Sequence, residues 1–174
     1  MESTVKFIEE KVKGFKPEIG IILGSGLGEL ADEYCDIAIP YSEIPGFISS
    51  TVKGHKGRLV FAEISGKKAV MMQGRSHFYE GHTMQEITYP VKVMKKLGVE
   101  TLILTNAAGA VNETYKPSDL MILKDHINCM GTNPLIGAND DTLGERFPDM
   151  SEVYKKDLRE LAGKCAEELS IDIK

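Results

Sequence analysis

The sequence contains no tryptophan, only three cysteines and no long apolar run. The cysteines are odd in number and never form a CxxC pair, so they signal neither a disulfide framework nor a zinc site, and we expect reduced thiols in the core. No stretch approaches the roughly 18 consecutive apolar residues that a membrane span needs. Residues 1–15 are amphipathic and charged where a secretory signal would be apolar. We therefore expect a cytoplasmic protein with no membrane partner.

An excess of positive charge is also missing. The chain has 21 Lys and Arg against 26 Asp and Glu, a formal net charge of −5. Neutralising a nucleic-acid backbone needs a basic face, so we expect no nucleic-acid partner. The four histidines include no HExxH motif, and the spacing of His77 and His82 does not place them on one helical face. We expect no metal ligands, and these exclusions favour work on small molecules.

The residues that are present suit one globular domain over 1–174. The chain is 42% hydrophobic, and at this length a folded protein buries roughly 68–70% of the surface that its unfolded form exposes. Strands are predicted at short apolar runs and at two β-rich runs around a Ser-Gly turn: 19–23, 57–73 as a hairpin, 101–104 and 120–125. Helices are predicted where capping residues precede helical periodicity: from Ser3 to about Gly14, from 84 to about 97 after Thr83, and from Ser151 to about Ser170.

This alternation predicts an α/β fold. The strand runs are apolar on both faces, which indicates a sheet covered by helices on both sides. The hairpin adds antiparallel pairing, so we expect a mixed central sheet. After the last helix, the segment 171–174 begins a strand-like run and the sequence stops, which suggests a C-terminally incomplete chain.

Anion-binding groups gather just after the strands. Residues Gly24–Gly28, including Ser25, follow the first strand and present backbone N–H groups and a hydroxyl. The segment is not a dinucleotide fingerprint, because Glu29 stands where the third glycine belongs, and no P-loop lysine follows. A plain tight turn is the equal alternative here.

Three further segments carry polar chemistry. His55 lies between glycines in a basic stretch, for which a solvated loop is the favoured alternative. Arg75 and His77 follow the second half of the hairpin, and a guanidinium fork suits two phosphate oxygens; salt-bridged arginine with packed aromatics is the alternative. Residues 105–109 follow the strand 101–104 and leave their backbone open to a ligand at the carboxyl end of that strand.

Six motifs in order resemble the trimeric purine nucleoside phosphorylases. They are GSGLG at 24–28, GHKGRL at 54–59, MMQGRSHFYEG at 71–81, LGVETLILTNAAG at 97–109, DHIN at 125–128 and NPLIGANDDTLGERFPDMSEVY at 133–154. The resemblance implies a mixed α/β sheet and a homotrimer. It implies phosphorolysis of inosine, guanosine and their deoxy forms to free purine and (deoxy)ribose 1-phosphate, in purine salvage. Inorganic phosphate is then a co-substrate, with no cofactor and no metal.

The resemblance also implies roles for individual residues. The implied phosphate-binding residues are Ser25, His55, Arg75, Ser76, His77 and Ala107, the last through its backbone N–H. The implied nucleoside-binding residues are Tyr79, Asn106, Ala108 and Phe147, with Phe147 reaching into the pocket of a neighbouring subunit. His77 and His55 are the implied catalytic residues.

The sequence departs from the family pattern at several points. Ser76 stands where relatives often carry Phe, His82 where many carry Tyr, and Ala110 where a second glycine is usual. Family members continue for roughly another third of their length, and that part carries the groups that grip the purine. Two alternatives to a phosphorylase therefore stay open: an inert phosphate-binding fragment, and a methylthioadenosine phosphorylase, which the DHIN segment disfavours. For the 174 residues alone we expect phosphate binding without turnover of inosine.

Overall fold

The computed structural model describes residues 1–48 and 56–174. It divides into two compact units, Met1–Ala107 and Ala108–Lys174, which are described separately. Whether 1–174 behaves as one domain stays a prediction. No helix in the described part of the chain is long and apolar enough to cross a membrane.

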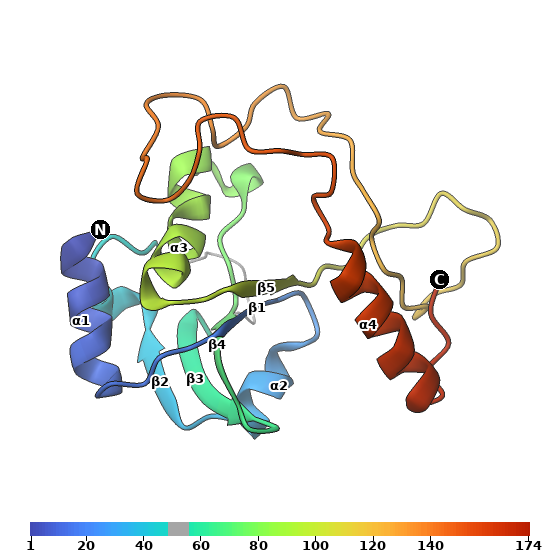
Figure 1. Cartoon of the computed structure of the whole chain (residues 1–174), viewed down its shortest axis with the longest axis horizontal. Helices are drawn as coiled ribbons and strands as arrows, with labels where there is room; N and C mark the ends of the chain where they lie inside the picture. Colours follow the sequence, from blue (N-terminus) through green and yellow to red (C-terminus); the bar gives the residue numbers. More distant parts are fainter. Residues whose placement is uncertain (49–55) are drawn as a thin grey trace. The chain divides into compact units, whose positions relative to one another are not determined.

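The first unit is built on a mixed sheet in the order β2-β3-β4-β1-β5 (Figure 1). The strand β1 (Ile19–Leu23) lies between β4 (Lys67–Gln73) and β5 (Thr101–Leu104) and is parallel to both. The strand β3 (Arg58–Ile64) pairs antiparallel with β4 and with β2 (Ile37–Pro40). The predicted mixed α/β sheet is confirmed.

The predicted hairpin is also confirmed, as β3 and β4. Its two turn residues both have positive φ, 51° at Ser65 and 77° at Gly66. Positive φ at both central residues is typical of the two-residue turn whose twist matches that of the flanking strands. This turn fixes the register in which Arg58 lies opposite Gln73 at the other end of the hairpin.

Helices cover both faces of the sheet, as the apolar strand runs predicted. The helices α1 (Glu2–Val12) and α3 (Met84–Leu97) lie on one face, and α2 (Gly28–Glu33) lies on the other (Figure 1). The larger core joins residues of α1 and α3 to β1, β2, β3 and β4, whereas the smaller core packs Ala31 of α2 against β1, β3 and β4. Two short 3₁₀ turns, η1 (Tyr41–Glu43) and η2 (Phe78–Glu80), follow β2 and β4.

The start and end of α3 follow the predicted capping signals. The Thr83 hydroxyl accepts the backbone N–H of Glu86 at 3.2 Å, and the Glu86 carboxylate accepts the backbone N–H of Thr83 at 2.7 Å. Gly98 ends the helix with φ 106°, a left-handed conformation that glycine adopts without steric strain.

Several sequence-based predictions were wrong. The last helix, α4 (Lys156–Glu168), starts five residues after Ser151, whose backbone N–H instead donates to the Asp149 carboxylate in a turn. The run 120–125 is not a strand, because its pairing is limited to one isolated parallel bridge between Leu120 and Ile173, with two backbone hydrogen bonds to Lys174. The three cysteines, expected in the core, are exposed thiols: Cys35, Cys129 and Cys165.

Candidate functional site

The three parallel strands end side by side, so the loops that follow them meet at one edge of the sheet. The loop Gly24–Gly28 follows β1, the segment Gly74–His77 follows β4, and the segment Thr105–Ala107 follows β5. All three belong to the first unit. Open α/β sheets bind ligands at this edge, and the predicted phosphate residues in these loops are therefore close together.

Arg75 joins the three strand ends. Its Nη1 donates to the carbonyl oxygen of Thr105 at 2.8 Å and lies 3.4 Å from the carbonyl oxygen of Leu23. These contacts hold the guanidinium between the ends of β1 and β5. The residue is only partly buried, and its Nε and Nη2 atoms carry further N–H groups that can bind an anion.

Thr105 locks the glycine loop to the end of β5. Its Oγ1 accepts the backbone N–H of Gly24 at 2.7 Å and donates to the carbonyl oxygen of Ile22 at 3.0 Å. A Cβ on Gly24 would lie 2.8 Å from the carbonyl oxygen of Thr105, so no side chain fits at this position. The loop after β1 is therefore fixed close to β5. Gly26, with φ 85°, turns it left-handed beside the exposed Ser25.

His77 is oriented by a buried carboxylate. Its Nδ1 lies 2.9 Å from Oε1 of Glu80, whose side chain is 3% exposed, and its backbone N–H donates to the same oxygen at 2.7 Å. An ionised carboxylate only accepts, so Nδ1 carries a proton, and Nε2 can donate to a phosphate oxygen only when the ring carries a second proton. The ring of Tyr79 stacks on His77 with centroids 4.8 Å apart, and Tyr79 is 76% exposed.

A buried tyrosine fixes the backbone just before Arg75. The hydroxyl of Tyr41 donates to the carbonyl oxygen of Gly74 at 2.7 Å. Burial raises the pKa of Tyr41 well above its ordinary value, so this hydroxyl stays a donor at any working pH. The position from which Arg75 projects is thus held by a contact that does not titrate.

The remaining predicted site residues are placed differently. Ser76 lines a small hollow with Tyr41, Phe47 and Pro90, and Asn106 is exposed after β5. His55 lies outside the described residues. Ala108 and Phe147 belong to the second unit.

Phe147 is a prominent surface residue of the second unit. It is 85% exposed, with the Arg146 guanidinium 5.7 Å from its ring centroid. It lines an open hollow of about 320 Å³ with Leu135, Ile136 and Met150. Its predicted role at a neighbouring subunit stays a prediction.

Sequence reasoning missed four residues that organise this edge of the sheet. Thr105 and Glu80 lie within the recognised motifs but were not assigned roles. Gln73 is 3% exposed at the end of an otherwise apolar strand, and its amide donates to the carboxylate of Asp32 in α2. A buried glutamine directly before Gly74 was the one local signal, because a buried amide requires partners. Among the described residues, no group of three or more His, Cys, Asp or Glu is arranged to hold a metal ion.

Comparison with known proteins shows the family of the chain. The family model of the phosphorylase superfamily matches residues 18–174, which is most of the chain. The chain belongs to the phosphorylase superfamily. The superfamily to which the six motifs pointed is thereby confirmed.

Named relatives of this phosphorylase chain are similar over almost all of its length. Purine nucleoside phosphorylase 1 of Geobacillus stearothermophilus is 56% identical over 100% of the chain, and that of Bacillus subtilis is 54% identical over 99%. The chain spans 64% of the length of each. The structure of isoform 2 of Schistosoma mansoni purine nucleoside phosphorylase, in complex with cytosine and ribose 1-phosphate, matches with a TM-score of 0.90 and 45% identity. That match covers 97% of this chain and 60% of the other.

Proposed function

We propose that this phosphorylase chain carries the phosphate-binding half of a purine nucleoside phosphorylase site. The observation that carries the proposal is the meeting of Arg75, His77 and the Gly24–Gly28 loop at the carboxyl ends of β4 and β1, beside the backbone of Ala107 after β5. Both curated relatives are named purine nucleoside phosphorylase 1, which favours this function over the methylthioadenosine alternative.

The reaction is phosphorolysis of inosine, guanosine or their deoxy forms. The bond from the anomeric carbon to the purine nitrogen breaks, and a bond from the same carbon to a phosphate oxygen forms. The leaving purine takes the bonding electron pair and, in the overall balance, the proton that the phosphate gives up on forming the new bond. The products are free purine and (deoxy)ribose 1-phosphate. Inorganic phosphate is the co-substrate, and the mechanism calls for no cofactor.

The chain's own groups act on the phosphate. Arg75 binds phosphate oxygens through its planar fork. His77 donates through Nε2 in its doubly protonated form, in which Nδ1 also donates to Glu80. Ser25 and the Ala107 N–H complete the donors. Held in place, the phosphate dianion stabilises the positive charge that develops on the sugar carbon as the purine leaves. Because Thr105, Tyr41 and Glu80 fix these groups beforehand, little reorganisation is needed in the transition state.

Further roles belong to the same proposal. Tyr79 stacks on His77, and the resemblance assigns it to the ribose side of the phosphate. The resemblance assigns Asn106 and Ala108 to nucleoside binding. A homotrimer, in which Phe147 enters the pocket of the neighbouring subunit, agrees with the exposure of that ring. The cytoplasmic location and purine salvage rest on the sequence and the resemblance.

The test is phosphate-dependent release of hypoxanthine from inosine. Two proteins are compared: the 174-residue chain, and a chimera in which the remainder of the Geobacillus stearothermophilus relative follows Lys174. We expect release by the chimera in the presence of a chelator, and its loss in the chimera carrying His77→Ala. Release that does not depend on phosphate would contradict the proposal, as would release that His77→Ala leaves unchanged.

A further inference from the structure

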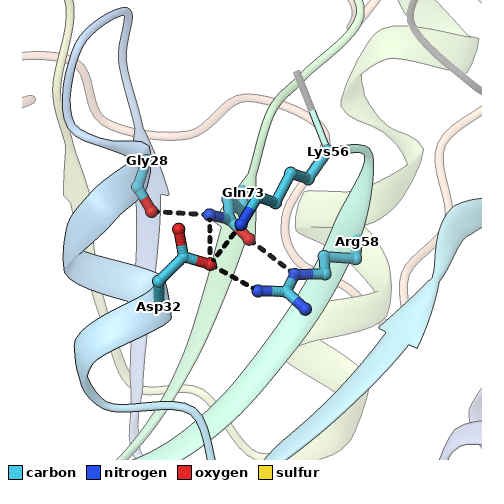
Figure 2. Close-up of polar contacts among 5 residues, drawn as sticks. All are labelled: Gly28, Asp32, Lys56, Arg58 and Gln73. Carbon is cyan, nitrogen blue, oxygen red and sulfur yellow. Dashed lines mark hydrogen bonds and ion pairs between the residues drawn. The ribbon is translucent and has the colours of Figure 1, made fainter. Parts of the chain in front are cut away.

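A polar cluster lies beside the glycine loop and outside the groups assigned to phosphate. It joins Asp32 of α2 to Gln73 at the end of β4, and to Lys56 and Arg58 at the start of β3 (Figure 2). Gly28, the last residue of the glycine loop and the first of α2, completes it through its carbonyl oxygen. All members belong to the first unit.

Gln73 is the buried centre of the cluster, and every polar atom of its side chain is used. Its Nε2 donates to the carbonyl oxygen of Gly28 at 2.6 Å and to Oδ1 of Asp32 at 3.1 Å. Its Oε1 accepts from Nε of Arg58 at 2.6 Å. The residue is 3% exposed, so removing any one partner leaves one N–H or the carbonyl oxygen of the amide unpaired away from water.

Asp32 is the solvent-exposed acceptor of the cluster. Its Oδ1 accepts from Nη2 of Arg58 at 2.6 Å and from Nζ of Lys56 at 2.7 Å, in addition to the Gln73 amide. These contacts, first that of Lys56 and then that of Gln73, lower the pKa of Asp32 below its ordinary value. The carboxylate is therefore ionised throughout the neutral range.

The cluster connects two of the three loops that carry the phosphate donors. The Gln73 side chain donates a hydrogen bond to the last residue of the Gly24–Gly28 loop. The Gln73 backbone continues through Gly74 to Arg75. A shift of Gln73 would therefore move both sets of donors. Donors that bind an anion tightly must be held in place by surrounding groups, so the placement of this amide bears directly on phosphate affinity.

We propose that Asp32 and Gln73 are positioning residues that hold the glycine loop against the end of β4 and thereby set the affinity for inorganic phosphate. The proposal rests on the proposed function of the same site. Neither residue is assigned to touch the phosphate. Asp32 acts through the Gln73 amide, and Gln73 acts through the carbonyl oxygen of Gly28.

A purely electrostatic role would have the opposite effect. An ionised aspartate near an anion site repels the anion, and its removal would leave Lys56 and Arg58 uncompensated. Phosphate would then bind more tightly without the Asp32 charge. Under the positioning role phosphate binds more weakly, so the sign of the change separates the two.

The experiment is calorimetric titration of the 174-residue chain with inorganic phosphate. We expect Asp32→Asn to raise the dissociation constant for phosphate roughly 3- to 30-fold, with little change in Tm. Glu18→Gln is the matched control, because Glu18 forms a similarly exposed ion pair with Lys67 at the opposite end of the hairpin. It should leave phosphate binding unchanged.

A second variant keeps the test sharp. Gln73→Met removes all three hydrogen bonds of the amide at similar volume, and it should also weaken phosphate binding. Combined with Asp32→Asn, it should weaken binding by less than the product of the two single effects, because both act through one contact.

Each other result overturns the proposal. Unchanged or tighter binding in Asp32→Asn overturns it, as do independent effects of the two variants. Loss of the folded circular-dichroism spectrum in Asp32→Asn assigns Asp32 to folding instead. An absence of phosphate binding in the wild-type chain overturns the proposed function as well, which distinguishes the two failures.

Discussion

Single residues hold the loops of this site in place, and Thr105 shows how. One hydroxyl accepts from Gly24 and donates to Ile22, so it joins the glycine loop, β1 and the end of β5. The contact spans 81 residues of sequence. A sequence motif cannot reveal such a contact, because it depends on which strands become neighbours.

We expect Thr105→Val to weaken phosphate binding roughly 3- to 10-fold, since a typical hydrogen bond contributes about 0.5–1.5 kcal/mol. Valine keeps the branched shape of threonine but leaves the Gly24 N–H without its acceptor. Thr105→Ser, which keeps the hydroxyl, is the control and should bind nearly as the wild type does. Titration calorimetry with phosphate measures both, and equal weakening by the two variants would contradict this role.

A site residue could be predicted from the sequence where its chemical partners are close in the sequence, and not where packing brings them together. Arg75 and His77 stood out because a guanidinium and an imidazole follow a strand within three residues of each other. Asp32 and Gln73 did not, because an exposed aspartate and a strand-end glutamine acquire their role only when α2 and β4 pack together. His55 lies outside the described residues, and its assignment stays a prediction.

At the level of elements, α3 is specified most completely by its own sequence. At its first turn, the Glu86 carboxylate accepts from the backbone N–H and the hydroxyl of Thr83, and the Thr83 hydroxyl accepts from the Glu86 backbone N–H. The backbone and side-chain hydrogen bonds from Thr83 lower the pKa of Glu86. Since the folded pKa is depressed, this contribution to stability is present above the ordinary pKa of 4.5 and is lost as pH falls through the folded value.

We expect Thr83→Ala to lower the free energy of unfolding by about 1 kcal/mol at neutral pH. The difference from wild type should shrink as pH falls below 4.5, because protonated Glu86 no longer accepts these bonds. Thermal unfolding followed by circular dichroism from pH 7 to pH 3 measures this. A difference that grows on acidification would contradict the capping account.

Elements with strong local signals were predicted, and those that depend on neighbours were not. β1, β5, the hairpin and α3 have apolar runs, turn residues or caps of their own. α2 is a six-residue helix, too short to show periodicity, and β2 is a four-residue strand that ends in proline. The run 120–125 has strand-like residues but lacks a partner strand, so its composition was misleading.

At the scale of the molecule, the two units differ in how much apolar surface they bury. Among the described residues, the buried hydrophobic side chains all lie in Met1–Ala107 except Ala166. Several large apolar residues of the other unit are more than half exposed, including Val111, Ile127 and Phe147. Backbone amide hydrogens in segments with few buried contacts exchange faster with solvent.

We therefore expect slow hydrogen exchange in β1, β3 and β4 and fast exchange across 108–155. Mass spectrometry of peptic fragments over seconds to hours measures both in one sample, with α3 as the internal reference for a packed helix. Equal protection of the two units would contradict this distribution of stability.

The central claim is that phosphate binds where β1, β4 and β5 end, and amide chemical shifts test it most directly. The ¹⁵N-labelled chain is titrated with inorganic phosphate, and the same titration is repeated with Arg75→Ala. We expect saturable shifts concentrated in Gly24–Gly28, in Arg75–His77 and at Ala107, and their loss in Arg75→Ala. An absence of saturable shifts, shifts centred elsewhere, or an unchanged titration in Arg75→Ala would contradict the claim.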